Sequence, residues 1–154
     1  MNARLKTLRA RRGQNGAAAV EFALIVTPLL VLCFGMIQYG MYFYSAQVGS
    51  NTANAVARQL SVGNCQASGA LQSFVDGQLG AAKTASASIT TAFVNADGTA
   101  ATASTVTTGG TVTVNISFDT LNMNFPFVPF LDDPTVDRTV QARVEDNTDE
   151  GCGA

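Results

Sequence analysis

The sequence predicts an α+β protein in which a long N-terminal transmembrane helix extends into a small domain with a second helix and a three- to four-stranded antiparallel sheet. Three observations predict this fold. Residues 17–37 form an apolar run with a single charge, small residues then recur at helical spacing, and from residue 87 onward apolar and polar residues alternate. We expect three parts: a basic leader at 1–16, a transmembrane helix with an extramembrane extension at 17–62, and a globular α+β domain at 63–154.

The apolar run is long enough to cross a bilayer. As a helix, residues 17–37 span about 30 Å, roughly one hydrocarbon thickness. A secretory signal peptide is the alternative, but its apolar region would be only about 7–15 residues long, followed by a small-residue cleavage site. Residues 45–47 offer only a weak site of that kind, so a retained helix is favoured. Pro28 lies inside the run, where membrane helices tolerate a slight kink.

The net charge of −2 conceals a strong asymmetry. Residues 1–16 hold five basic residues and no acid, whereas the rest holds four basic and all eleven acidic residues, which sum to −7. Basic residues beside an apolar segment stay on the cytoplasmic side. We therefore expect a single-pass membrane protein with its N-terminus cytoplasmic and everything after about Tyr44 outside. Membrane lipid is the expected partner of the basic patch; nucleic acid is not, because the apolar run follows directly.

Glu21 is the single charge of the apolar run. An unpaired carboxylate inside a bilayer costs at least about 2.5 kcal/mol, so it calls for a function or a partner. The other interpretation is that Glu21 lies at the interface and reaches water. The residues alone leave both interpretations open.

Residues 11–30 read RRGQNGAAAVEFALIVTPLL. This stretch resembles the start of TadE-like proteins, the prepilin-like components (pseudopilins) of the tight-adherence, or Tad/Flp, pilus system. The family pattern is a basic leader, a Gly at the cleavage site, a Glu five residues later, an aromatic residue, and an apolar helix. The resemblance implies cleavage between Gly16 and Ala17, with Glu21 and Phe22 as assembly residues. Major Flp pilins share this site but have very short mature chains, so the length of this chain favours the TadE class.

The resemblance also implies a fold, a function and partners. The fold would be pilin-like, and the protein would lie in the bacterial inner membrane with its C-terminal domain periplasmic. The function would be that of a minor pilin, cut by a prepilin peptidase and needed for pilus assembly or tip formation, supporting adhesion. After cleavage, Glu21 would pair with the new α-amine of a neighbouring subunit. Other pilins or pseudopilins and the Tad inner-membrane assembly platform would be its partners, and the chain would either enter the pilus or stay in the membrane. The alternative is an uncleaved, membrane-anchored periplasmic ligand-binding module.

The helix is expected to continue beyond the membrane and to stop near Gly63. One face of this helix carries residues that recur at alternating spacings of four and three, and we call them the seam: Tyr42, Ala46, Gly49, Ala53, Val56 and Leu60. Most of them are small, which allows another helix or a sheet to approach closely. Packing against the chain's own domain is favoured over packing against another subunit, although both can coexist on different parts of the helix.

The remaining elements follow from periodicity. A second helix at 68–82 would present four apolar residues on one face: Leu71, Phe74, Val75 and Leu79. Strands are expected at 87–93, 112–118 and 136–144, with turns at 95–98 and 109–110. The two helices would cover the apolar face of the sheet. Residues 125–130, FPFVPF, cannot form a regular strand around two prolines; they would either fold back onto the core or offer an apolar contact to a partner.

The three cysteines divide into two groups. Cys33 lies in the apolar run and is expected to be a packing residue. Cys65 and Cys152 lie in the oxidising compartment, and a disulfide between them would contribute about 4–5 kcal/mol if unstrained. The alternatives are two free thiols or a bond between chains.

The sequence shows few of the residue patterns that enzymes use. The chain has no His, which removes Ser-His-Asp, Cys-His and His-metal arrangements. No phosphate-binding glycine motif occurs. Asp132 and Asp133 are adjacent at an expected turn, where carboxylates are usually solvated. We expect no enzyme activity, no catalytic residue, no metal and no cofactor.

Overall fold

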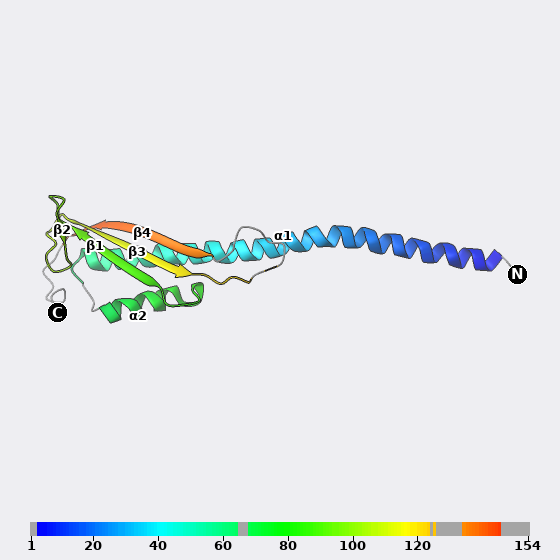
Figure 1. The fold of residues 1–154 in the computed structure, drawn as a ribbon, viewed down its shortest axis with the longest axis horizontal. Helices are drawn as coiled ribbons and strands as arrows, with labels where there is room; N and C mark the ends of the chain where they lie inside the picture. Colours follow the sequence, from blue (N-terminus) through cyan, green and yellow to red (C-terminus); the bar gives the residue numbers. More distant parts are fainter. Residues whose placement is uncertain (1–2, 65–67, 124, 126–133, 146–154) are drawn as a thin grey trace.

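The computed structural model describes the backbone of residues 3–64, 68–123, 125 and 134–145. A helix far longer than the domain dominates the shape (Figure 1). The elements follow in the order α1 (Ala3–Ser61), α2 (Ser68–Leu79), a 3-10 turn η1 (Gly80–Ala82), β1 (Ser88–Val94), β2 (Ala100–Ala101), β3 (Thr111–Asp119) and β4 (Thr135–Arg143). This α+β architecture, with two helices and a four-stranded antiparallel sheet, confirms the predicted fold class.

Helix α1 runs unbroken for 59 residues and passes through Pro28. Just before the proline, the Thr27 hydroxyl donates to the Ala23 carbonyl at 2.8 Å, so this polar group is satisfied inside the helix. The helix ends where the sequence predicts. Gly63 adopts a left-handed φ of 76°, and the Asn64 N–H donates to the Gln59 carbonyl at 3.0 Å.

The sheet has the order β2-β1-β3-β4, with all pairs antiparallel. β3 alternates regularly, with its even-numbered residues buried (Val112, Val114, Ile116, Phe118). The Thr/Ala-rich stretch between β1 and β3 yields only the two-residue strand β2. Beyond it, the chain turns through Thr102–Thr105, where the Thr102 N–H donates to the Thr105 hydroxyl at 2.9 Å. Hydroxyl side chains that bond the local backbone favour such turns over a longer strand.

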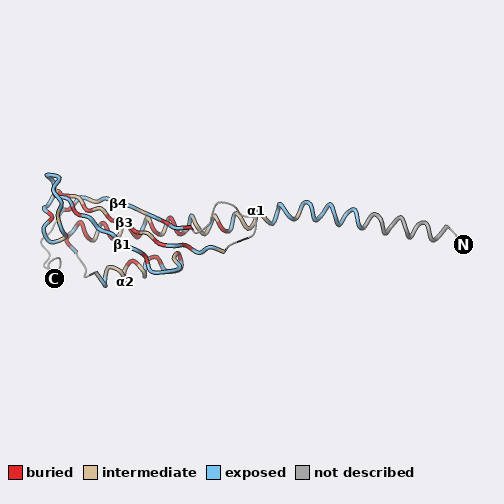
Figure 2. Tube along the Cα trace, in the orientation of Figure 1, coloured by how far each residue is buried: buried red, intermediate tan, exposed pale blue. Residues whose placement is uncertain are grey.

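The apolar face of the sheet lies along the C-terminal half of α1, and α2 runs beside that half (Figures 1 and 2). One continuous core joins residues of both helices to residues of the sheet, among them Val56 of α1, Val75 and Leu79 of α2, and Ile116 of β3. The predicted seam of α1 belongs to this packing: five of its six residues are buried, and Tyr42 is half-buried. Packing of the seam on the chain's own domain is therefore confirmed.

Gly49 is a point of close contact between α1 and the sheet. A Cβ atom there would lie 2.9 Å from Phe118 Cε1 and 3.3 Å from Val136 Cγ1. Contacts of this length exclude a side chain unless the aromatic ring shifts. The small residue at this point of the seam therefore sets the distance between the helix and the sheet.

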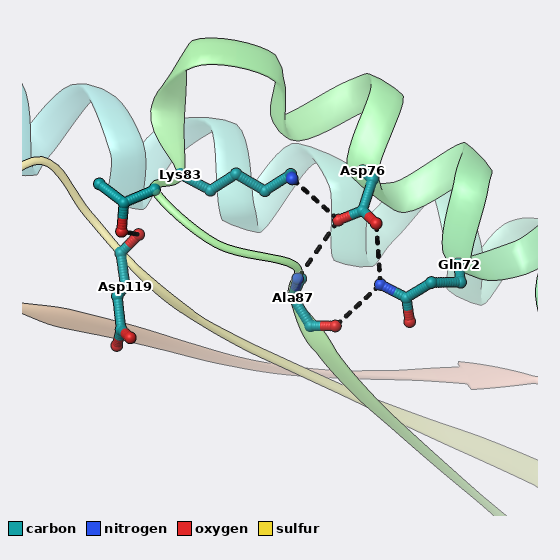
Figure 3. Close-up of polar contacts among 6 residues, drawn as sticks. Gln72, Asp76, Lys83, Ala87 and Asp119 are labelled. Atoms are coloured by element: carbon teal, nitrogen blue, oxygen red, sulfur yellow. Dashed lines mark hydrogen bonds and ion pairs between the residues drawn. The ribbon is translucent and has the colours of Figure 1, made fainter.

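The start of β1 is fastened to α2 by a polar cluster (Figure 3). Gln72 Nε2 donates to Asp76 Oδ2 at 3.1 Å and to the Ala87 carbonyl at 2.9 Å. Asp76 Oδ1 accepts the Ala87 N–H at 3.2 Å and lies 3.1 Å from Lys83 Nζ. The Gln72 amide, with the Ala87 N–H and the Lys83 ammonium, holds the pKa of Asp76 below its ordinary value.

We predict that Gly49→Val destabilises the domain by about 1–3 kcal/mol, because the new side chain overpacks against Phe118 and Val136. Gly40→Val is the matched control, since a Cβ at Gly40 meets nothing within 4 Å. We expect the control to stay within about 0.5 kcal/mol of the parent chain. Guanidinium unfolding of the detergent-solubilised chain, followed by near-ultraviolet circular dichroism, measures both. Equal stability of the two variants would contradict the role of Gly49.

We predict that Asp76→Asn weakens the joint between α2 and β1 by about 1 kcal/mol at neutral pH, through loss of the charged acceptor. Because the folded pKa of Asp76 lies below its ordinary value of 3.8, its stabilising contribution is complete above that value and is lost as the pH falls through the folded pKa. The stability difference between parent and variant should therefore vanish in strong acid. Unfolding curves at neutral pH and at about pH 2 test this; an undiminished difference in acid would refute it.

Candidate membrane-anchoring and assembly site

The exposure of α1 changes along its length (Figure 2). From Gly16 to Leu30 every residue except the half-buried Val26 is exposed, although most are apolar. Beyond Ser45, one face is buried under the sheet and α2. Large apolar side chains that water would otherwise surround, such as Phe22, Leu24 and Ile25, require a bilayer or another chain. In the part of the chain that the structure describes, this is the one helix with the length and apolar composition to cross a membrane.

Gly16 and Ala17 lie inside α1 and are exposed. The backbone at Gly16 is helical, as it is on both sides of the predicted cleavage site. The reason is local. Ala17, Ala18 and Ala19 are the strongest helix formers, and one glycine costs a helix only about 1 kcal/mol. A Cβ at Gly16 would meet nothing within 4 Å.

Glu21 and Phe22 are both exposed, and 68% of Phe22 is accessible. Glu21 lies four residues after Ala17, one helical turn away on the same face. The described side chains form one ion pair, between Lys83 and Asp76. Within the described part of the chain, Glu21 therefore has no cationic partner. The structure thus places the four predicted processing and assembly residues together on one uncovered stretch of helix.

The covered part of α1 begins at a joint that sequence reasoning missed. Gln38 is 2% exposed although it directly follows the apolar run. Its Nε2 donates to the Leu121 carbonyl at 3.4 Å, and its Oε1 accepts the Met123 N–H at 3.2 Å. One turn lower, Phe34 stacks on Phe125 with centroids 4.8 Å apart. Two features of the sequence belong to this contact: an amide residue at the end of the apolar run and an uncharged, Phe-rich segment. Nothing in the sequence indicates that the two lie together.

The remaining predicted residues are placed only in part. Cys33 is half-buried and free. Cys65 and Cys152 lie outside the described residues, so their disulfide stays a prediction. Of the FPFVPF stretch, Phe125 folds back onto α1, whereas 126–130 lie outside the described residues, as do Asp132 and Asp133.

Comparison with known proteins bears on the helix alone. Residues 16–58 match the family model described as TadE-like protein. No curated protein and no solved structure matches the chain. The matched segment begins at Gly16, contains Glu21 and Phe22, and ends near the C-terminus of α1, whereas the sheet lies outside it. The long helix is therefore similar to the TadE-like family model, both in its exposed part and in its sheet-bound part.

Proposed function

We propose that this chain is a minor pilin-like subunit of a Tad pilus, anchored in the bacterial inner membrane by α1 and needed for pilus assembly or tip formation, and thereby for adhesion. The observation that carries the proposal is the divided helix: one face of 45–61 is buried by the chain's own domain, whereas 16–30 is mostly apolar and uncovered. Such a helix can hold its domain at a fixed distance from the membrane and still offer a free surface to other helices.

Processing by a prepilin peptidase would occur between Gly16 and Ala17, at the cytoplasmic end of the span. The leader, with its five basic residues, would stay on the cytoplasmic side. Because the bond lies in a helix, the peptidase would have to unwind a turn, and Gly16 lowers the cost of unwinding by about 1 kcal/mol compared with alanine. Cleavage would leave an α-amine on Ala17, which is largely protonated near neutral pH.

Glu21 would supply the assembly contact. Its carboxylate is uncovered at the level of the span, and burying it unpaired costs at least about 2.5 kcal/mol. An amine from the cleaved end of a neighbouring pilin or pseudopilin would offset that cost and fix the axial register of the two helices. Phe22, beside it and also exposed, would add apolar contact area. The assembly platform of the Tad system would act on the same membrane-level surface.

We predict that Gly16→Val slows cleavage at least tenfold, because a β-branched residue at the cut resists local rearrangement and enlarges the site. Gly35→Val is the matched control, since a Cβ meets nothing within 4 Å at either glycine and the fold should tolerate both changes. Intact mass and N-terminal sequencing of the chain from its native host give the readout. The parent should begin at Ala17; a parent still beginning at Met1 in the presence of the peptidase would favour the uncleaved ligand-binding module instead.

We predict that Glu21→Ala and Glu21→Gln leave cleavage normal but abolish or strongly reduce pilus formation, because both remove the charge that pairs with the amine. Leu32→Ala is the control, because it shortens an exposed side chain on the same helix without changing any charge. This variant should form pili normally. Electron microscopy of surface pili together with the cleavage assay separates the two steps. Normal pili in both Glu21 variants would show that the carboxylate has no part in assembly.

A further inference from the structure

The segment that leaves β3 runs back along α1 toward the membrane-level part of the helix (Figure 1). We call residues 120–123 with Phe125 the descending limb. Its first residue is fixed to the start of β4, because the Thr120 N–H and the Thr120 hydroxyl both donate to the Pro134 carbonyl, each at 3.0 Å. From there the limb reaches Gln38 and then Phe34 of α1. It therefore returns about four residues, or roughly 6 Å, along the helix between these two contacts.

The depth of these contacts follows from the helix. If Ala17 marks the cytoplasmic edge of the span, Phe34 lies about 26 Å further along, inside a hydrocarbon layer of about 30 Å. Gln38 then lies at or just beyond the outer edge. The Phe125 ring, which stacks on Phe34, would then lie at the level of the hydrocarbon.

The chemistry of the limb suits this position. No charged residue occurs between Asp119 and Asp132. Leu121 is 43% exposed, so an apolar side chain faces outward from the limb. Backbone groups that would lack water are paired with a side chain instead: Gln38 bonds the Leu121 carbonyl and the Met123 N–H. Such pairing is what non-helical backbone requires near the hydrocarbon.

We propose that the descending limb is a second membrane contact, seated among lipids in the outer interface beside α1. It would make the domain touch the membrane at two points and so fix its rotation about the helix. The proposal rests on the proposed anchoring of α1, and its partner is bilayer lipid. A second copy or another pilin covering the limb is the competing outcome.

The chain contains no tryptophan, so a single introduced one reports its own surroundings. We would prepare the full chain as Leu121→Trp in vesicles of phosphatidylcholine and phosphatidylglycerol, with or without lipid brominated near the headgroup end of its acyl chains. Bromine quenches tryptophan only on close contact. Met36→Trp, 69% exposed on α1 within the span, is the positive control. Val94→Trp, 36% exposed on β1, is the control away from the membrane.

We predict that bromolipid quenches Leu121→Trp to a similar extent as Met36→Trp and at least about twofold more than Val94→Trp, because interfacial aromatic side chains contact lipid. Quenching of Leu121→Trp no greater than that of Val94→Trp, with Met36→Trp quenched, would overturn the proposal. A blue-shifted but unquenched Leu121→Trp would also overturn it and assign the limb to a protein contact. Failure of Met36→Trp to be quenched would instead count against the anchor.

Discussion

The continuity of α1 is the constraint on which the other features depend. One helix supplies both the apolar membrane-level surface at 16–30 and the buried seam of the domain beyond Ser45. A flexible linker between anchor and domain would let the domain tumble. An unbroken helix instead transmits position directly, at about 1.5 Å per residue, so the height of the sheet above the bilayer is set by the sequence between Glu21 and the seam. Pro28 does not interrupt this, since the helix continues through it.

The seam works because its residues are small where the sheet is bulky. Phe118 and Val136 lie against Gly49, and a larger residue there would push the sheet away from α1.

Polar groups at the edge of the sheet also contact α1. Arg138 interrupts the apolar alternation of the edge strand β4. Its Nε donates to the Ala46 carbonyl at 3.4 Å, so a hydrogen bond joins this half-buried side chain to α1. After β4, the Glu145 N–H donates to the Ser61 carbonyl at 2.8 Å and satisfies an orphan acceptor at the end of the helix.

Periodicity predicts those elements whose own side chains determine their burial. The seam of α1, the apolar face of α2, the alternation of β3 and the stop at Gly63 are all legible because each is a local pattern. What the sequence could not predict depends on contacts between distant residues. The pairing of Gln38 with 121–123 spans more than eighty positions, and a single sequence carries no record of it.

In the proposed pilin-like subunit, the cytoplasmic end and the outer end of the apolar stretch of α1 would both affect how easily the chain leaves the bilayer. In the proposed precursor, the leader holds five basic residues, and drawing each through the membrane centre would cost about 2.5–3.5 kcal/mol. Removing residues 1–16 would abolish that barrier and leave Glu21 as the charge to be paired. At the outer end, a limb seated among lipids would add apolar contact that extraction must break. Cleavage would thus free the cytoplasmic end, while the limb would still hold the domain at the membrane. The proposed subunit would then stay in the bilayer until neighbouring helices replace its lipid contacts.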